Sequence, residues 1–257
     1  MGTISDINPG NFTAMIRVVI HHTCKSSYTL YKALKGEAGI NFEMATTPYF
    51  PYLRQYVLSV PAVFKDGELV LLDPVEPGDV LALREGKTEK ELDVEEAVEN
   101  AVRAVMASQA MLSAVMLYKS LRPVLDPEIV AVISRARFHK QEHKVGQIAK
   151  VLAEREAGIL EEHWERFVKL LTFGLVRELY WLGIDVEEVE KSHVKMWLLA
   201  KATVGRLGLP HPVPKVPEEV ADAVWAVLKE SGRRYLDRVI EEQQIIQSDA
   251  EFISLAK

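Results

Sequence analysis

Short apolar runs and helical spacings alternate over the early part of the chain, and this pattern predicts strands and helices in turn. A strand is expected over residues 15–20, a short run rich in branched apolar side chains, and another over residues 40–45, where apolar and polar positions alternate. Between them, Leu30, Tyr31 and Leu34 have the spacing of one helix face. The order strand, helix, strand predicts a parallel pair of strands.

A hairpin and further helices complete this part of the chain. Asp66 and Gly67 separate two apolar runs, and this dipeptide is the strongest short-range signal for a β-hairpin. Helices are expected over residues 48–56 and 77–84, each of which begins at a proline. We therefore predict an α/β domain over residues 13–86, in which a mixed four-stranded sheet is flanked by helices.

The pattern changes at residues 86–93, a charged stretch that we interpret as a linker with few contacts. Only helical signals follow it, which predicts a larger all-α bundle over residues 93–257. Asp93 is expected to cap the first helix, with Glu96 as its acidic partner. One apolar stripe predicts that this helix continues to Pro123. The stripe consists of Val94, Val98, Val102, Val105, Leu112 and Met116. Further helices are expected over residues 137–155, 159–182, 186–207 and 217–247, with a short one after Ser248.

Composition and charge narrow the function classes. The chain has 257 residues, of which 48% are hydrophobic and 26% charged, and its net charge of −6 argues against nucleic acid and anionic membranes as partners. No apolar run approaches the length of a membrane span, and the N-terminus lacks the pattern of a secretion signal. A single cysteine also fits a reducing compartment, so we expect a cytoplasmic protein. Sparse Asn and Gln beside abundant Glu, Lys and Arg favour a heat-adapted, thermophilic source.

The candidate for chemistry is Cys24, which stands where the first predicted strand ends and the first helix begins. Unpaired N–H groups and the helix dipole at such a position favour a thiolate, so the pKa of this cysteine is expected to lie below its free value of about 8.5. His21, His22 and Lys25 add positive charge nearby. The alternative is that Cys24 is a small buried hydrophobic residue.

The residues that follow carry a family resemblance. Residues 52–70, with Val60 and Pro61 directly before the hairpin, closely resemble the second half of the thioredoxin fold. Together with Cys24 and Ser27 after the first strand, the match covers the whole predicted α/β domain. The resemblance implies that the Val60–Pro61 bond is cis and that Pro61 lies against Cys24. It also implies that the backbone of Val60 is free to pair with a peptide or a thiol substrate.

Two departures from the thioredoxin-like superfamily shape the predicted chemistry. Thr23 replaces the tryptophan that thioredoxins carry before the first cysteine, and Ser27 replaces their second cysteine. With one cysteine in the chain, no internal disulfide can form, and monothiol chemistry is left. Cys24 would form a mixed disulfide, as in monothiol glutaredoxins. Alternatively, Cys24 or a nearby hydroxyl would activate a thiol cofactor bound over Val60, as in glutathione transferases. Ser27 would donate a hydrogen bond to the thiolate in either case.

The predicted catalytic residues are Cys24 and Ser27, and the predicted substrate-binding residues are Lys25, Val60 and Pro61. The two-domain layout also resembles a glutathione transferase, which would place the substrate pocket between the domains. We expect no bound cofactor apart from a small thiol such as glutathione or an equivalent. The expected partner is a small thiol or a cysteine-containing protein, and the sequence is compatible with a homodimer. The alternative function is a non-catalytic thioredoxin-like adaptor whose helical domain binds a protein partner.

Two clusters of acidic and histidine residues are weaker candidates. His139 and His143 fit the H-x-x-E-H pattern of inverted zinc peptidases, with both imidazoles expected one turn apart on a helix. The surrounding lysines and arginines disfavour a divalent metal. Residues 161–165 contain three glutamates and a histidine, but a solvated helix face is favoured because a matching Glu-x-x-His motif on another helix is missing. We predict no metal site.

Overall fold

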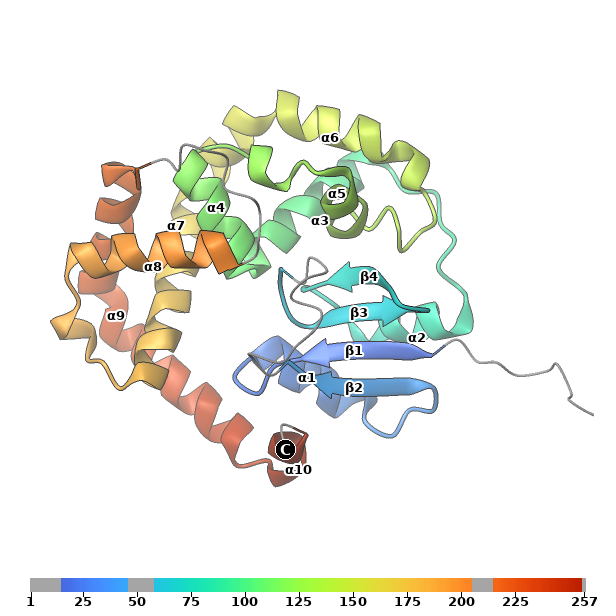
Figure 1. The fold of residues 1–257 in the computed structure, drawn as a ribbon, viewed down its shortest axis with the longest axis horizontal. Helices are drawn as coiled ribbons and strands as arrows, with labels where there is room; N and C mark the ends of the chain where they lie inside the picture. Colours follow the sequence, from blue (N-terminus) through green and yellow to red (C-terminus); the bar gives the residue numbers. More distant parts are fainter. Residues whose placement is uncertain (1–14, 46–57, 205–214, 256–257) are drawn as a thin grey trace, which may run out of the picture.

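A mixed sheet positions the candidate cysteine. The computed structural model describes residues 15–45, 58–204 and 215–255, so the helix predicted over residues 48–56 lies outside the described residues. Four strands form one sheet in the order β2-β1-β3-β4 (Figure 1), with β1 and β2 parallel and β3 antiparallel to both of its neighbours. The predicted parallel pair and hairpin are confirmed. The strands are β1 (Ile16–Ile20), β2 (Ile40–Met44), β3 (Ala62–Lys65) and β4 (Glu68–Leu72).

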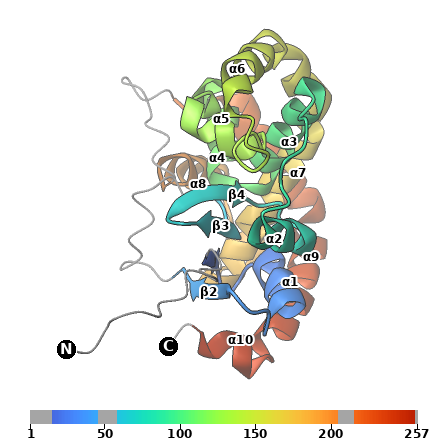
Figure 2. The same ribbon diagram turned by 90° about the vertical axis from the view of Figure 1, so that its right-hand side faces the viewer.

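Each face of the sheet packs against a different layer. Along β1, Ile16, Val18 and Ile20 are fully buried and share a core with the two sheet helices, which Figure 2 shows together on one side of the strands. Val19 points the other way and joins Phe64 in a core that continues into the helical part of the chain. Alternation along the strand therefore buries both faces. The sheet helices are α1 (Lys25–Leu34) and α2 (Pro77–Glu85).

A larger helical part follows the sheet, and the predicted fold class is confirmed. Its long helices α7 and α9 lie side by side, and α9 leads to the short C-terminal helix α10 next to α1 (Figures 1 and 2). Helix α8 begins later than predicted, at Lys191, because residues 186–188 form a separate 3₁₀ turn. The helices are α3 (Val94–Ala107), α4 (Gln109–Tyr118), α5 (Pro127–Ile133), α6 (Val145–Glu154), α7 (Glu156–Leu182), α8 (Lys191–Val204), α9 (Glu218–Gln247) and α10 (Ala250–Ser254).

The single long helix predicted from the apolar stripe is wrong, because the chain turns sharply at Ser108. Helices α3 and α4 meet there with a bend of 100°. Ser108 is extended, with φ −99° and ψ 114°, and its side chain caps α4 by accepting the N–H of Met111. Its hydroxyl also donates to the carbonyl of Leu58. The two helices together have the length and composition of a membrane span, which no single described helix has.

A second predicted helix is also interrupted. The helix expected over residues 137–155 begins only at Val145, because Lys140 takes a left-handed conformation with φ of 57°. Arg135, just before the predicted range, is also left-handed, with φ of 65°. The guanidinium of Arg135 donates two hydrogen bonds, of 2.9 and 2.8 Å, to the carboxylate of Asp79 on α2. This turn before α6 therefore joins the helical part to a helix of the sheet domain.

The predicted linker is docked against the helical part. Leu92 is fully buried, and its carbonyl accepts a 2.7 Å hydrogen bond from the ammonium of Lys144. Thr88 is also buried, and its carbonyl lies 2.8 Å from Nδ1 of His139. The expectation of few contacts across this segment is therefore wrong. The domain bounds themselves stay a prediction.

Candidate functional site

Cys24 lies at the predicted junction between β1 and α1. It is the half-buried N-cap residue of α1, and its thiol donates a hydrogen bond of 3.4 Å to the carbonyl oxygen of Val60. The Val60–Pro61 peptide bond is cis, which confirms what the resemblance implies, and Pro61 is buried. The carbonyl of Val60, which was expected to be free for a substrate, is instead the acceptor of the thiol.

Ser27 also belongs to this group, whereas Lys25 turns away from it. Ser27 is fully buried one turn along α1, and its hydroxyl accepts the backbone N–H of His21 at 3.2 Å. The same hydroxyl faces the sulfur of Cys24. The ammonium of Lys25 lies 5.5 Å from the centre of the Tyr28 ring, further along the helix. The structure thus brings the predicted site residues together except Lys25.

The expected lowering of the thiol pKa is wrong, because the site is buried. Burial is the largest effect, and it raises the pKa of Cys24. The charge of Asp73 raises this pKa further, while Ser27 and Arg177 lower it. His21 adds no charge at neutral pH, since burial lowers its pKa to about 4. The resting thiol is therefore protonated, in agreement with its hydrogen bond to a carbonyl oxygen.

Asp73 is a site residue that the sequence reasoning missed. It follows β4, it is 9% exposed, and its carboxylate accepts a hydrogen bond of 3.4 Å from the hydroxyl of Ser26. Burial raises the pKa of Asp73 to about 7, although Ser26 and Arg177 act against this shift. A carboxyl group with a pKa near neutral pH can take up and release a proton, and the charge of Asp73 acts on the thiol of Cys24. The signal in the sequence is an aspartate directly after an apolar strand.

Helices α7 and α9 hold the loop that precedes the cysteine. Gln243, fully buried on α9, donates through Nε2 to the carbonyl of Thr23 at 3.0 Å. Gln247 donates to the carbonyl of His22 at 3.3 Å. Trp181 on α7 meets the ring of His22 edge-on, with ring centres 6.1 Å apart, and is 43% exposed. These residues are far from the loop along the chain, so no local pattern reveals them.

Some residues around Cys24 carry buried polar atoms that have no hydrogen-bond partner. Among the described residues they include Nε of Arg177, Oε1 of Gln243 and Nδ1 of His22. The guanidinium of Arg177 is fixed by an ion pair of 2.8 Å between Nη2 and the carboxylate of Glu242. Buried polar groups normally find partners, so each of these three atoms is left with an unused capacity for one hydrogen bond.

A cavity of about 280 Å³ lies between the sheet and the helical part, next to Asp73. Leu72 and Pro74, the two neighbours of that aspartate, line its sheet side, and Asn100 and Arg103 line its helical side. The volume suits a small molecule rather than a protein segment. The residues that line this cavity do not include Cys24, Val60 or Pro61, so the predicted substrate pocket stays a prediction.

The H-x-x-E-H segment does not have the predicted helical geometry. His139 is buried in a turn, with Nδ1 bonded to the carbonyl of Thr88, and His143 belongs to a 3₁₀ turn. The acidic residues in the range 161–165 are exposed on α7. Over the described ranges, no group of three or more His, Cys, Asp or Glu side chains is placed to hold a metal ion.

In comparisons with known proteins, no family model, curated protein or solved structure matches the chain. Without a match, the chain is classified by its fold and its candidate site. The fold is a mixed four-stranded sheet with flanking helices and a larger helical part. Its site is a cysteine at a helix N-terminus, hydrogen-bonded to the residue before a cis-proline.

Proposed function

We propose that this chain is a thioredoxin-superfamily protein that carries out monothiol thiol–disulfide chemistry through Cys24, as an oxidoreductase or a thiol transferase. The observation that carries the proposal is the 3.4 Å contact between the thiol of Cys24 and the carbonyl of Val60, beside the cis peptide bond of Pro61. The strand order β2-β1-β3-β4, with its parallel first pair, agrees with that superfamily.

The first step forms a mixed disulfide. The sulfur of Cys24 attacks one sulfur of a disulfide R–S–S–R, a new S–S bond forms, the old one breaks, and the second sulfur leaves as a thiolate. The two electrons lost by Cys24 reduce the leaving sulfur, so no further oxidant is needed. The thiol proton passes to the carboxylate of Asp73 and from there to the leaving thiolate, which makes Asp73 the proton carrier.

An outside thiol completes the cycle. The chain has one cysteine, and Ser27 stands where a second one would act. A small thiol R′–SH therefore attacks the substrate sulfur of the mixed disulfide and releases R–S–S–R′, and the proton of R′–SH returns to Cys24. The hydroxyl of Ser27 stabilises Cys24 as it leaves as a thiolate, because it lowers the pKa of that cysteine.

The substrate is a small polar thiol or its disulfide, such as glutathione or an equivalent. Once the sulfur of Cys24 enters a disulfide, the carbonyl of Val60 loses its donor and can accept an N–H of the substrate. Nε of Arg177 and Oε1 of Gln243, which have no hydrogen-bond partner, offer one donor and one acceptor. A substrate with amide and carboxylate groups satisfies all three.

The direct test is capture of a small thiol on Cys24. The purified chain is incubated with glutathione disulfide, and its intact mass is measured without reducing agent. We expect one glutathionyl group on the wild-type chain and none on the Cys24→Ser variant. A wild-type chain that remains unmodified after prolonged incubation contradicts the proposal.

The role of Asp73 is tested in the same assay. Asp73→Asn is expected to slow adduct formation at neutral pH by about a hundredfold, the lower end of the range for a positioned proton-transfer group. Asp66→Asn is the matched control, because Asp66 is exposed in the hairpin turn. This variant is expected to react at the wild-type rate.

A non-catalytic adaptor is the second candidate, and two observations favour it. Burial raises the pKa of Cys24, and α9 holds the loop before it. In that case the thiol is a packed core group and the helical part binds a protein partner. The adduct assay separates the two functions, because an adaptor reacts with glutathione disulfide only after it has been unfolded in urea.

A further inference from the structure

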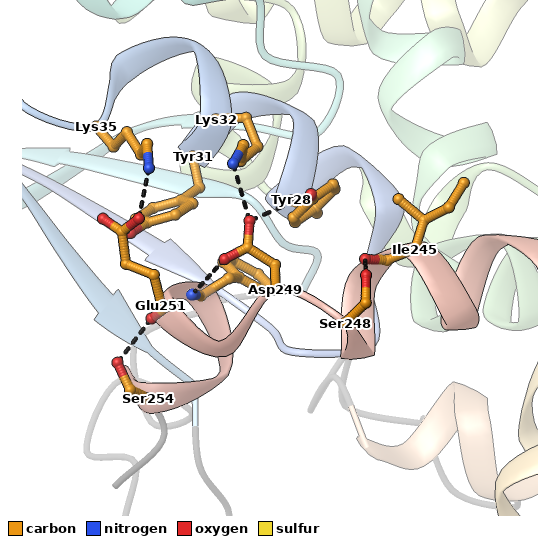
Figure 3. Close-up of polar contacts among 10 residues, drawn as sticks. Tyr28, Tyr31, Lys32, Lys35, Ile245, Ser248, Asp249, Glu251 and Ser254 are labelled. Carbon is orange, nitrogen blue, oxygen red and sulfur yellow. Dashed lines mark hydrogen bonds and ion pairs between the residues drawn. The ribbon is translucent and has the colours of Figure 1, made fainter.

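The C-terminal helix α10 docks on the outer face of α1, the helix that Cys24 caps (Figure 3). Asp249, the N-cap residue of α10, accepts a hydrogen bond of 3.3 Å from the hydroxyl of Tyr28. It also accepts one of 2.9 Å from the ammonium of Lys32. The first contact thus combines an aromatic hydroxyl and a cation on α1 with one carboxylate.

A second carboxylate repeats this contact further along α1. Glu251 accepts a hydrogen bond of 3.0 Å from the hydroxyl of Tyr31 and forms an ion pair with Lys35. Phe252 is fully buried, and its ring centre lies 5.2 Å from that of Tyr28 and 5.1 Å from that of Tyr31. Residues three and four apart share one helix face, so α1 presents a continuous aromatic and basic strip to α10.

The same stretch of chain also holds the other side of the site. Just before α10, Gln243 and Gln247 of α9 bind the carbonyls of Thr23 and His22, which precede the cysteine. Residues 243–254 therefore contact both the loop before Cys24 and the helix after it.

We propose that residues 243–254 form a latch, which holds the loop before Cys24 against α1 and limits access to the thiol until the segment undocks from α1. Local opening of a terminal segment costs less free energy than global unfolding, because it disrupts few contacts. The inference concerns access to the thiol and does not rest on the reaction proposed above.

The latch is built from contacts that salt weakens. The side chains of Lys32 and Lys35 are 42% and 36% exposed, so their ion pairs with α10 are screened by dissolved ions. Protonation is not the release signal near neutral pH. The hydrogen bond from Lys32, with that from the N–H of Phe252, lowers the pKa of Asp249 to about 2.

The test measures the rate at which iodoacetamide, an uncharged reagent, alkylates Cys24 in the full-length chain at fixed pH. Lys35→Glu and Glu251→Lys break the same ion pair, and each is expected to raise the rate about two- to fivefold, the factor for one exposed pair. The double variant re-forms the pair with its charges exchanged and is expected to return to the wild-type rate. The two substitutions change the local charge in opposite directions, so an effect on the thiol pKa alone would move the two rates in opposite directions.

The matched control is Glu241→Lys, which makes the same change of charge on the exposed face of α9 and is expected to keep the wild-type rate. In the wild-type chain, potassium chloride is expected to raise the rate toward that of the single variants, which provides a measurement without any substitution. Circular dichroism verifies that each variant is folded. Single variants at the wild-type rate, rates that move in opposite directions, or a double variant that stays fast would each overturn the latch, as would a wild-type rate that salt does not change.

Discussion

The thiol of Cys24 donates a hydrogen bond of 3.4 Å to the main-chain carbonyl of Val60. The residue before the cis-proline therefore favours the protonated form of the cysteine. Burial acts in the same direction, because it destabilises the thiolate. A helix N-terminus alone therefore does not make this cysteine reactive. In the reaction that we propose, another group takes the proton, and Asp73 is our candidate because its charge acts on the thiol and its own pKa is raised to about 7.

The pH dependence of alkylation should show the protonated thiol directly. We expect the rate of Cys24 alkylation to rise with a midpoint above the value of about 8.5 for free cysteine, because burial favours the neutral thiol. Ser27→Ala removes a hydroxyl that lowers this pKa, so it should move the midpoint higher still. A midpoint below that of free cysteine contradicts the burial argument.

Replacement of Asp73 by Asn should flatten the pH dependence of stability between about pH 4 and pH 7. Burial raises the pKa of Asp73 from 3.8 to about 7, so in this window the folded chain holds a proton that the unfolded chain releases. The stabilisation is complete below the unfolded pKa and is lost as the pH rises through the folded pKa, at most about 4 kcal/mol for such a shift. Urea unfolding at several pH values measures it. Asp66→Asn, the exposed control, should show the same pH dependence of stability as the wild type.

Ser27→Cys should convert the site into one that forms an internal disulfide. The hydroxyl of Ser27 faces the sulfur of Cys24, and Cβ atoms three residues apart on a helix lie about 5 to 6 Å from each other. A disulfide needs about 3.8 Å, which small adjustments provide. The new thiol is held at high effective molarity, so it should resolve the mixed disulfide and confer insulin-reducing activity.

Mass spectrometry under non-reducing conditions detects this disulfide. The control is Ser26→Cys, since Ser26 is exposed and its hydroxyl bonds Asp73 instead. That variant is expected to form no internal disulfide. If the Ser27→Cys chain stays reduced in oxidising buffer, the arrangement of the site is refuted.

Limited proteolysis should leave residues 86–93 uncut at early times. Leu92 is buried, and Lys144 binds both the carbonyl of this leucine and the carboxylate of Glu91. Lys144→Ala should therefore speed cleavage of this segment severalfold, about the factor that one or two lost contacts of this kind give. In the Lys150→Ala variant, which changes the exposed face of α6, the segment should be cleaved at the wild-type rate. Early cleavage of the wild-type segment would instead support two independently compact domains.

The sheet domain could be predicted because its signals are local. The hairpin at Asp66 and Gly67 and the strand-to-helix junction at Cys24 depend on near neighbours in the sequence, and both are present in the structure. The bend at Ser108 was missed, because a serine within a periodic apolar stripe is compatible with a helix. The carbonyl to which its hydroxyl donates belongs to Leu58, which is 50 residues earlier in the chain.

The candidate site could be predicted only as far as the family pattern reaches. That pattern brought Cys24 and Pro61 together, but Arg177 and Gln243 enter the site through tertiary packing alone, and the position of Asp73 after an apolar strand was not recognised. The sign of the thiol pKa shift was missed for a related reason. The sequence shows cationic residue types near the cysteine, but burial determines whether they are charged, and no local pattern measures burial.

The hydrogen bond from Ser108 to Leu58 limits the exchange of the sheet or the helical part between different proteins. Leu58 lies just ahead of the cis-proline, so the position of the backbone that meets the cysteine depends in part on a residue at the corner between α3 and α4. A chimera that joins this sheet to a foreign helical bundle would carry over every residue of the cysteine loop and still lose that hydroxyl. The two parts of the chain are therefore not interchangeable modules, and the chemistry at the cysteine belongs to their combination.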